Sequence, residues 1–396
     1  MPRAIKSEGG MGLKFGLIGG VAALGLLAGA AAAEPVKVGM VTTLSTGAGY
    51  LGEDVRDGFS LALEMAGATD RVELLVEDDG LEPENGVQIA QRMVERDGAQ
   101  VMTGIIFSNV AMAVVPKLVR DGMIYLSPNA GPSALAGKGC HENYFNVAWQ
   151  NDDLHGAMGA YVAQQGFDNV YLLAPNYPAG KDALTGFKRF YKGGIAGEVY
   201  TQLGQTDYAA ELANLRAAGP DAVFFFYPGG MGINFVKQAA QAGISQEIPF
   251  FGPAFSFDDT LLDAVGDAAV GIKNTSQWSP DLDNAANKAF VAAFKEKYGR
   301  YPTLYASQGF DTANLLLSAM DAVGDDLSDQ DAFREALRAA DFVSVRGDFR
   351  FGPNQHPIQD IYVREAYVDA SGNVTNRIIG TVLEDHADAY AEECTM

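Results

Sequence analysis

The fold of this chain is restricted most by a regular alternation of short β-rich runs with amphipathic helical segments. In the first series, strands are expected at 36–41, 72–76, 101–106 and 123–126. The segments between them carry apolar residues at helical spacing, such as Val55, Phe59 and Ala62. Repeated strand, helix, strand units of this length predict a parallel sheet with helices on both faces.

A second series of the same kind follows Asn151. Its expected elements are helices from 154 onward, at 182–191 and at 232–242, with strands at 170–174, 222–226 and 248–252. Helical stretches then come at 284–298, 305–323 and 330–340, before β-like runs at 349–351, 361–368 and 378–382. The pattern therefore predicts an α/β protein with two doubly wound parallel-sheet lobes.

Residues 1–33 have the pattern of a secretory signal peptide. Arg3, Lys6 and Lys14 precede an uncharged stretch that ends in three alanines before Glu34. A basic leader, an apolar middle and small residues before the cut are typical of a cleaved signal. A membrane anchor is the alternative, but the stretch consists mostly of Gly and Ala and ends in a cleavage-type sequence. No cysteine directly follows the alanines, so we expect a mature chain that begins near Glu34 and lies free in the periplasm.

The net charge of −22 argues against two classes of partner. Nucleic-acid backbones and anionic lipid surfaces carry the same sign, and they repel the chain within a Debye length, about 10 Å in 0.1 M salt. Beyond the leader, no stretch is apolar enough to cross a bilayer. We expect no nucleic-acid binding and no membrane insertion of the mature chain.

Two cysteines, Cys140 and Cys394, lie beyond the leader. In an oxidising compartment two cysteines most simply form a disulfide, although two unrelated thiols are the alternative. On the chain-entropy account, a bridge that closes so long a loop stabilises the fold by about 4 to 5 kcal/mol.

Motifs for catalysis or cofactor binding are weak. The sequence Gly47-Ala48-Gly49-Tyr50-Leu51-Gly52 has the spacing of a dinucleotide fingerprint. Residues 42–46 separate it from the strand end, where a pyrophosphate-binding turn needs its glycines, so no cofactor is expected. Metalloprotease, paired-cysteine and nucleophile-elbow motifs do not occur. The four histidines are interpreted as surface or turn residues (His141, His155, His356 and His386), so we expect neither a metal site nor an enzyme.

Seven aromatic residues are expected where the two lobes face each other. They lie at or just past the C-terminal ends of predicted strands or in connections between the lobes, where open α/β sheets place ligands. These residues are Tyr50, Phe107, Trp149, Tyr177, Tyr227, Phe255 and Trp278. We expect about half of them to line a pocket, the others belonging to the ordinary core.

Several strand-end sequences, in their order and spacing, resemble the branched-chain amino-acid binding proteins of ABC importers, which are type I periplasmic binding proteins. The sequences are Val36-Lys37-Val38-Gly39 onward to Gly52, Gly104-Ile105-Ile106-Phe107-Ser108, Leu126-Ser127-Pro128-Asn129-Ala130 and Phe251-Gly252-Pro253-Ala254. The resemblance covers essentially the whole chain after the leader.

The resemblance implies two lobes joined by three crossovers, placed near 149–151, 277–280 and 346–351. The N-terminal lobe is then 34–150 plus 279–347, and the C-terminal lobe is 151–278 plus 348–396. A ligand is expected in the cleft between them, with closure by a hinge motion. By similarity, Ser108 and the backbone of Asn129, Ala130 and Gly131 would hold a carboxylate of the ligand.

One departure from the family bears on the ligand. Amino-acid binders of this family carry a glutamate after the Gly-Pro pair for the α-ammonium, whereas this chain has Ala254 followed by Phe255. An ammonium buried there without a counter-charge would be costly. The stretches 145–152 and 277–280 resemble members that bind aromatic acids such as hydroxybenzoates or cinnamates.

The function implied is that of a monomeric periplasmic protein that captures a small carboxylate, an aromatic acid in the first place, for the permease subunits of an ABC importer. The alternatives are a branched-chain amino acid or a short amide as ligand, and a sensor module that reports the ligand to a receptor.

Overall fold

The computed structural model describes residues 9, 10, 12 and 34–396. The signal peptide predicted at 1–33 lies outside the described part of the chain, apart from three isolated glycines. Everything below concerns residues 34–396.

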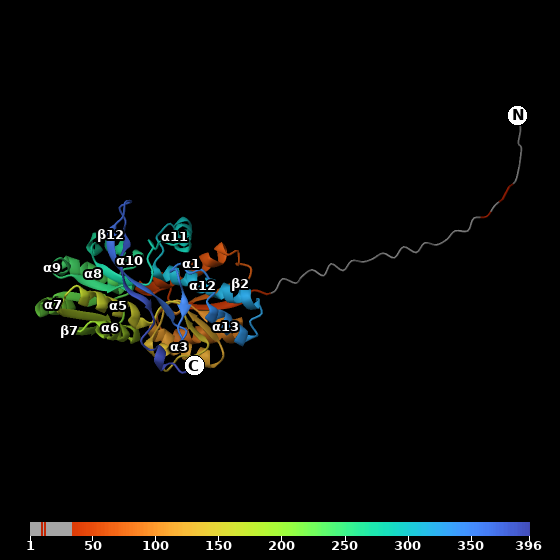
Figure 1. The fold of residues 1–396 in the computed structure, drawn as a ribbon, viewed down its shortest axis with the longest axis horizontal. Helices are drawn as coiled ribbons and strands as arrows, with labels where there is room; N and C mark the ends of the chain where they lie inside the picture. Colours follow the sequence, from red (N-terminus) through yellow and green to blue (C-terminus); the bar gives the residue numbers. More distant parts are fainter. Residues whose placement is uncertain (1–8, 11, 13–33) are drawn as a thin grey trace, which may run out of the picture. The chain divides into compact units, whose positions relative to one another are not determined.

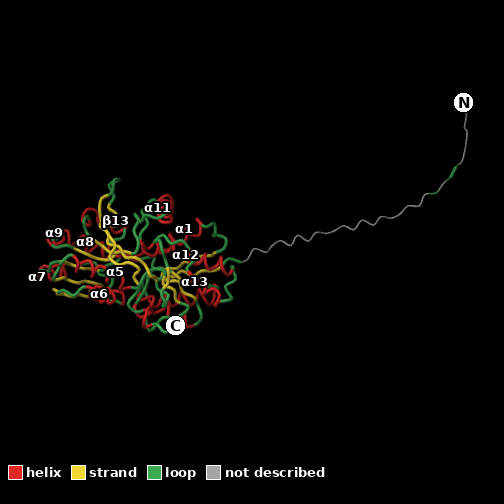
Figure 2. The backbone as a smooth tube through the Cα atoms, viewed as in Figure 1, coloured by secondary structure: helices red, strands yellow, loops and turns green. Residues whose placement is uncertain are grey.

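The first sheet is fully parallel and takes the strand order β2-β1-β3-β4-β5. β1 lies between β2 and β3, and its Val38, Met40 and Val41 are buried. Figure 2 shows these strands in yellow among red helices. The elements are β1 (Val36–Thr42), α1 (Gly49–Met65), β2 (Val72–Asp78), α2 (Pro83–Arg92), β3 (Val101–Thr103), α3 (Ser108–Arg120), β4 (Ile124–Ser127), α4 (Ser133–Ala136) and β5 (Tyr144–Asn146).

The second sheet has a parallel centre and an antiparallel margin. Its strand order is β11-β12-β10-β9-β8-β6-β7, with β13 paired to β12. The pairs from β7 to β10 are parallel, whereas β12 runs antiparallel to β10, β11 and β13. Its elements are α5 (Asn151–Gln164), β6 (Asn169–Pro175), α6 (Pro178–Phe190), β7 (Gly194–Thr201), α7 (Ala209–Ala218), β8 (Ala222–Phe225), α8 (Gly230–Gln241), α9 (Ile244–Glu247), β9 (Phe250–Pro253), α10 (Asp259–Val265), β10 (Lys273–Ser276), β11 (Arg350–Phe351), β12 (Pro357–Val368) and β13 (Val374–His386).

The chain passes between the two sheets three times. It leaves the first sheet after β5, returns after β10 through three helices, and rejoins the second sheet at β11. The three helices are α11 (Ala285–Tyr298), α12 (Leu304–Val323) and α13 (Gln330–Ala339). α12 packs along α1, and α13 packs on α12 (Figure 1). The predicted α/β fold class with two lobes and three crossovers is thus confirmed, while the residue boundaries given above for the lobes stay a prediction.

Three strands escaped the sequence analysis because they lack an apolar run. β5 has three residues, and β7 is largely exposed. β10 has the sequence KNTS, and its Asn274, Thr275 and Ser276 are buried all the same. Asn274 accepts hydrogen bonds from buried Arg364 at 2.7 and 2.9 Å and donates one to Asn376. Polar residues are tolerated in this strand because their hydrogen bonds are satisfied within the fold.

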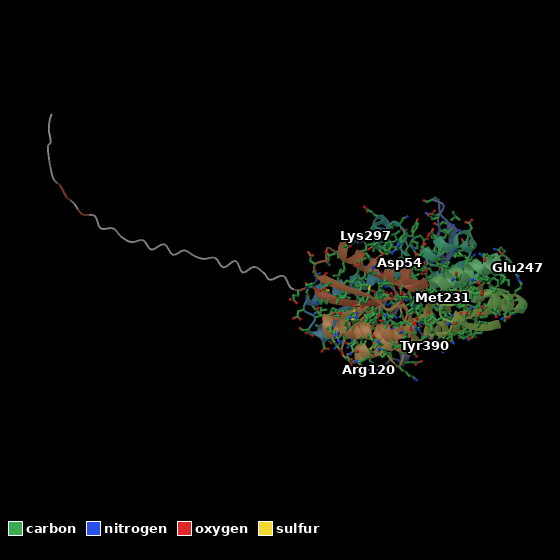
Figure 3. The ribbon with its side chains drawn as sticks, turned by 180° about the vertical axis from the view of Figure 1, so that it is seen from behind. Asp54, Arg120, Met231, Glu247, Lys297 and Tyr390 are labelled. Carbon is green, nitrogen blue, oxygen red and sulfur yellow. A yellow bond between two sulfur atoms is a disulfide. The ribbon has the colours of Figure 1, made fainter. Side chains whose placement is uncertain are left out.

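The Cys140–Cys394 disulfide predicted from the compartment is present, with the two residues 254 positions apart. It ties the C-terminal segment to the loop that precedes β5. Tyr390, labelled in Figure 3, lies in the same segment and donates its hydroxyl hydrogen to Asp152 at 2.9 Å. The C-terminal residues are therefore anchored on both sheets.

The dinucleotide-like motif has a packing role. A β-carbon at Gly49 would lie 2.6 Å from the carbonyl oxygen of Leu44, and one at Gly52 would lie 2.0 Å from that of Thr43. Side chains at these two positions would collide with backbone, so glycine is required for α1 to start so close to the end of β1. Packing thus explains Gly49 and Gly52, whereas a β-carbon at Gly47 would meet nothing closer than Gly230 Cα at 3.7 Å.

Candidate ligand-binding site

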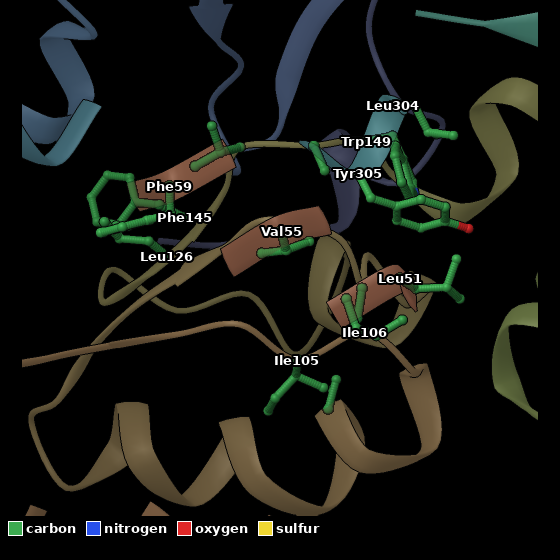
Figure 4. Packing of buried hydrophobic residues seen from close by; sticks show 14 of the residues in the cluster. Leu51, Val55, Phe59, Ile105, Ile106, Leu126, Phe145, Trp149, Leu304 and Tyr305 are labelled. Carbon is green, nitrogen blue, oxygen red and sulfur yellow. The ribbon is translucent and has the colours of Figure 1, made fainter. Parts of the chain in front are cut away.

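A small cavity opens between the C-terminal ends of strands from both sheets. The lining residues are Leu51, Ile106, Phe107, Ser108, Asn129, Ala130, Trp149, Asn151, His155, Tyr177, Ala179, Phe226, Pro228, Phe255 and Tyr305. Figure 4 shows Leu51, Ile106, Trp149 and Tyr305 close together at one end of the buried cluster.

One side of the cavity offers hydrogen-bond donors at the start of α3. Ser108 is the first residue of this helix, and Phe107 before it provides no side-chain cap. The first N–H groups of a helix have no partner within the helix, and they carry a partial positive charge. The buried Ser108 hydroxyl accepts a hydrogen bond from Asn151 Nδ2 at 3.1 Å, so its own hydrogen stays free to donate. This end of the cavity can bind a carboxylate.

The loop after β4 contributes less than the resemblance implied. The N–H groups of Ala130 and Gly131 already donate to Ile105 O at 3.4 Å and to Asn151 Oδ1 at 3.3 Å. Asn129 donates through Nδ2 to Ile106 O at 2.6 Å, and its buried Oδ1 has no partner among the described residues. The α3 start with Ser108 is therefore the stronger anion site.

Aromatic rings form the opposite wall. The Tyr177 and Phe226 rings stack with centroids 6.3 Å apart, Phe226 and Phe255 meet edge to face at 5.7 Å, and Phe255 and Trp149 lie 4.3 Å apart. Burial raises the pKa of Tyr177 and of Tyr305, so both hydroxyls stay protonated. This wall suits a flat apolar ring, with phenol hydroxyls as additional donors.

His155 lies in the same wall and is buried, which corrects its interpretation as a surface or turn residue. Its Nδ1 contacts the carbonyl oxygen of Asn151, and its ring packs on Phe226 at 4.9 Å and on Phe255 at 5.6 Å. Burial lowers the pKa of His155 to about 3, so the ring is neutral at physiological pH. His356 is buried too, so the surface interpretation is also wrong for that residue.

No residue that lines the cavity, in the described part of the chain, is an aspartate, glutamate, lysine or arginine. The position of the family's glutamate holds Ala254, which is fully buried. Asp258, nearby in sequence, is occupied by hydrogen bonds from Tyr50 and from the Leu261 N–H. The cavity therefore offers neutral donors for an anion and no counter-charge for a cation. Nor do the described residues bring three His, Cys, Asp or Glu side chains together as a metal would require.

Hydrogen bonds between the lobes surround the cavity. Tyr50, at the start of α1, donates its hydroxyl hydrogen to Asp258 before α10 at 2.8 Å. Ser133, at the start of α4, donates to Asp182 on α6 through its hydroxyl at 2.7 Å and its N–H at 3.0 Å. Because these bonds join the two sheets' helices, the structure corresponds to a closed cleft.

Seven of the predicted binding residues line the cavity, namely Phe107, Ser108, Asn129, Ala130, Trp149, Tyr177 and Phe255. Tyr50 and Gly131 lie next to lining residues in the sequence but do not line the cavity themselves. Tyr50 makes a hydrogen bond between the lobes. Gly131 lies in a turn where a β-carbon would be 2.0 Å from Trp149 O. The structure places Tyr227 and Trp278 elsewhere. Tyr227 packs on Tyr208 and Phe235, and Trp278 Nε1 donates to Asn287 at 2.7 Å. The binding role of all eleven stays a prediction.

The lining residues that the sequence analysis missed have different origins. Phe226 lines the cavity, whereas its neighbour Tyr227 was predicted to do so. Neighbouring side chains of an extended chain point to opposite faces, and the sequence does not show which face is turned to the cavity. Tyr305 comes from the first turn of α12, at least fifty residues after the strand ends that line the cavity, and no local signal places it there. The other missed residues are close in sequence to predicted residues or elements and could have been found by extending those predictions, namely Leu51, Ile106, Asn151, Ala179 and Pro228.

Residues 35–373 match the family described as periplasmic binding protein. The chain belongs to this family. A curated relative, the Leu/Ile/Val-binding protein homolog 6 of Brucella melitensis, is 26% identical over 376 residues, which cover 91% of this chain and 95% of the relative. An ABC transporter solute-binding protein from R. palustris, solved in complex with benzoate, is 29% identical with a TM-score of 0.86, covering 91% of this chain and 100% of the other. One from Rhodopseudomonas palustris BisB5, solved with 3,4-dihydroxybenzoic acid, is 28% identical with a TM-score of 0.82, covering 90% and 99%.

These similarities confirm the resemblance and the fold expected from the sequence. Periplasmic binding proteins of this kind are solute-binding components of ABC transporters and not enzymes. They bind small molecules and work with ABC permeases.

Proposed function

We propose that this periplasmic binding protein captures an aromatic carboxylate in the cavity and delivers it to an ABC importer. The observation that carries the proposal is the make-up of the cavity, with donors at the start of α3, an aromatic wall opposite and no charged lining residue in the described chain. Two solved relatives hold benzoate and 3,4-dihydroxybenzoate, which are molecules of this class.

The expected affinity is consistent with such a ligand. Burying a phenyl ring of about 150 Å² contributes roughly 4 kcal/mol, whereas micromolar affinity requires about 8 kcal/mol. The carboxylate must supply the remainder through charge-assisted hydrogen bonds, which are stronger than neutral ones. We assign these bonds to Ser108 and the first N–H groups of α3, which lie at one side of the cavity.

A branched-chain amino acid is the second candidate, because the curated relatives carry Leu/Ile/Val-binding names. Its carboxylate fits the α3 end, but its ammonium would have no acidic partner among the lining residues. A buried charge without a partner is costly, so the cavity disfavours this ligand.

A thermal-shift panel tests the class of ligand. A ligand at 100 times its Kd stabilises the folded protein by about 2.7 kcal/mol, which raises Tm by a few degrees. Benzoate and its hydroxylated forms are expected to raise Tm, while leucine, valine and short amides leave it unchanged. A shift with leucine and none with any benzoate would overturn the aromatic proposal.

We also propose that residues 1–33 direct export and are removed, so that the protein works in the periplasm as a monomer. Among the described helices, none is both long and apolar enough to cross a membrane. N-terminal sequencing of the periplasmic fraction should begin at or near Glu34. Recovery of the full-length chain in the membrane fraction would contradict this proposal.

A further inference from the structure

His155, which lines the cavity, has a hydrogen-bond acceptor without a partner among the described residues. Its Nδ1 contacts the carbonyl oxygen of Asn151, and a carbonyl can only accept, so the ring hydrogen is on Nδ1. In a neutral imidazole the other nitrogen, Nε2, is then an acceptor. Nε2 is buried and has no hydrogen-bond partner among the described residues.

The surroundings of His155 offer it no hydrogen. The ring meets Phe226, Phe255 and Phe224, with centroids at 4.9, 5.6 and 6.1 Å. The low pKa that burial gives His155 keeps Nε2 unprotonated at neutral pH. A buried acceptor without a partner is costly, and structures normally satisfy such groups. Since no described residue donates to Nε2, the hydrogen is left for the molecule that occupies the cavity to supply.

We infer that the ligand carries a hydroxyl or amino group on its aromatic ring, and that this group donates a hydrogen bond to His155 Nε2. The inference rests on the proposed function and narrows it to hydroxylated or aminated benzoates. His155 then acts as a residue that determines specificity, while the start of α3 binds the carboxylate.

The position of the donor on the ring follows from α5. Asn151 at its first position reaches Ser108 at the carboxylate end, and the backbone of His155 lies four residues further along the helix, a rise of about 6 Å. We infer that the acceptor is displaced from the carboxylate donors in the same direction, by roughly the length of a ring. This separation fits a donor in the meta or para position and not an ortho hydroxyl, which lies beside the carboxylate.

Asn129 Oδ1 is another buried acceptor in the lining without a partner among the described residues. Its amide donates to Ile106 O, two residues before α3 begins, so it lies at the carboxylate end. Asn129 is therefore the alternative acceptor for the ligand's ring donor, and the experiment includes a variant of it.

Calorimetry on refolded, ligand-free protein tests the inference with matched ligands. 4-Methylbenzoate and 4-hydroxybenzoate are similar in size, but only the second has a donor. We expect the better of 3- and 4-hydroxybenzoate to bind about 10-fold more tightly than its methyl analogue, and 2-hydroxybenzoate to show no such gain. In His155→Phe the preference for the hydroxyl analogue should vanish, and His155→Gln, which retains an acceptor, should restore part of it. Asn129→Ala should keep the preference.

The outcomes separate the inference from the function on which it rests. If the wild-type protein binds benzoate, and binds methyl and hydroxyl analogues equally, the inference is wrong and the proposed function stands. If the preference for the hydroxyl analogue survives in His155→Phe and disappears in Asn129→Ala, the acceptor is Asn129. That result would also overturn the inference. If no benzoate binds, the proposed function fails, and the inference with it. The comparison of methyl and hydroxyl analogues uses the wild-type protein alone, so it remains valid even if a variant fails to fold.

Discussion

Replacing Arg346 by methionine is expected to lower the free energy of unfolding by about 3 to 5 kcal/mol, the usual result of removing one partner from a buried ion pair. Arg346 Nε lies 2.9 Å from Asp311 Oδ2, and both side chains are almost fully buried. Arg346 also donates through Nη1 to Ala148 O and to Gln359, so it joins the first and third crossovers. Urea unfolding followed by circular dichroism measures the loss.

Two further variants show whether the buried charge is the cause. Arg377→Met removes an exposed pair with Glu365 and should cost no more than about 1 kcal/mol. Arg346→Met combined with Asp311→Asn removes both charges of the pair. The Val345 N–H, which donates to Asp311 Oδ1, can still donate to the amide oxygen of the new side chain, so part of the stability should return. A loss below about 1 kcal/mol in Arg346→Met would contradict the role assigned to this pair.

Replacing Ser108 by alanine is expected to weaken the binding of every benzoate by about 10- to 100-fold, since a hydrogen bond to a charged group contributes about 1.5 to 3 kcal/mol. Ser108 is buried at the first position of α3, and its hydroxyl is a donor facing the cavity. Calorimetry with benzoate and 4-hydroxybenzoate measures the change, which should be the same factor for both, because their carboxylates are alike.

Ser318→Ala is the matched control for Ser108→Ala. The Ser318 hydroxyl bonds Leu315 O within α12, and the residue does not line the cavity. This variant should bind benzoates as the unmodified protein does. If Ser108→Ala binds benzoates with unchanged affinity, the carboxylate does not bind at the start of α3, and this account of the site is wrong.

The alternation of apolar strands and amphipathic helices was sufficient to predict most of the fold. Strands such as β6 and β8 are almost entirely buried on both faces, and their sequences therefore contain continuous apolar runs. The pattern could not show β10, whose buried side chains are polar. One of them, Asn274, bonds Arg364 and Asn376, partners about a hundred residues away. β12 and β13 pair with each other across a short turn, whereas the antiparallel pairing of β12 with β10 joins residues about ninety positions apart, which the pattern could not show.

In the candidate site, the lining residues that could be predicted from the sequence are those that come soon after the end of a strand. Phe107 and Ser108 come a few residues after β3, and Tyr177 comes soon after β6, so their places in the cavity were predictable. His155 lies inside a helix, and its burial depends on rings contributed by two other strands, so its own sequence neighbours carry no such signal. Trp278 was misplaced because the chain turns there toward α11, where the indole bonds Asn287.

The most direct measurement of the central claim is a pair of calorimetric titrations of refolded, ligand-free protein, one with benzoates and one with leucine. Refolding matters because a captured ligand can survive purification and occupy the cavity. The account predicts micromolar or tighter binding of at least one benzoate and no heat with leucine, since no lining residue in the described chain supplies a charge for the ammonium. Micromolar binding of leucine, with no heat from any benzoate, would contradict it.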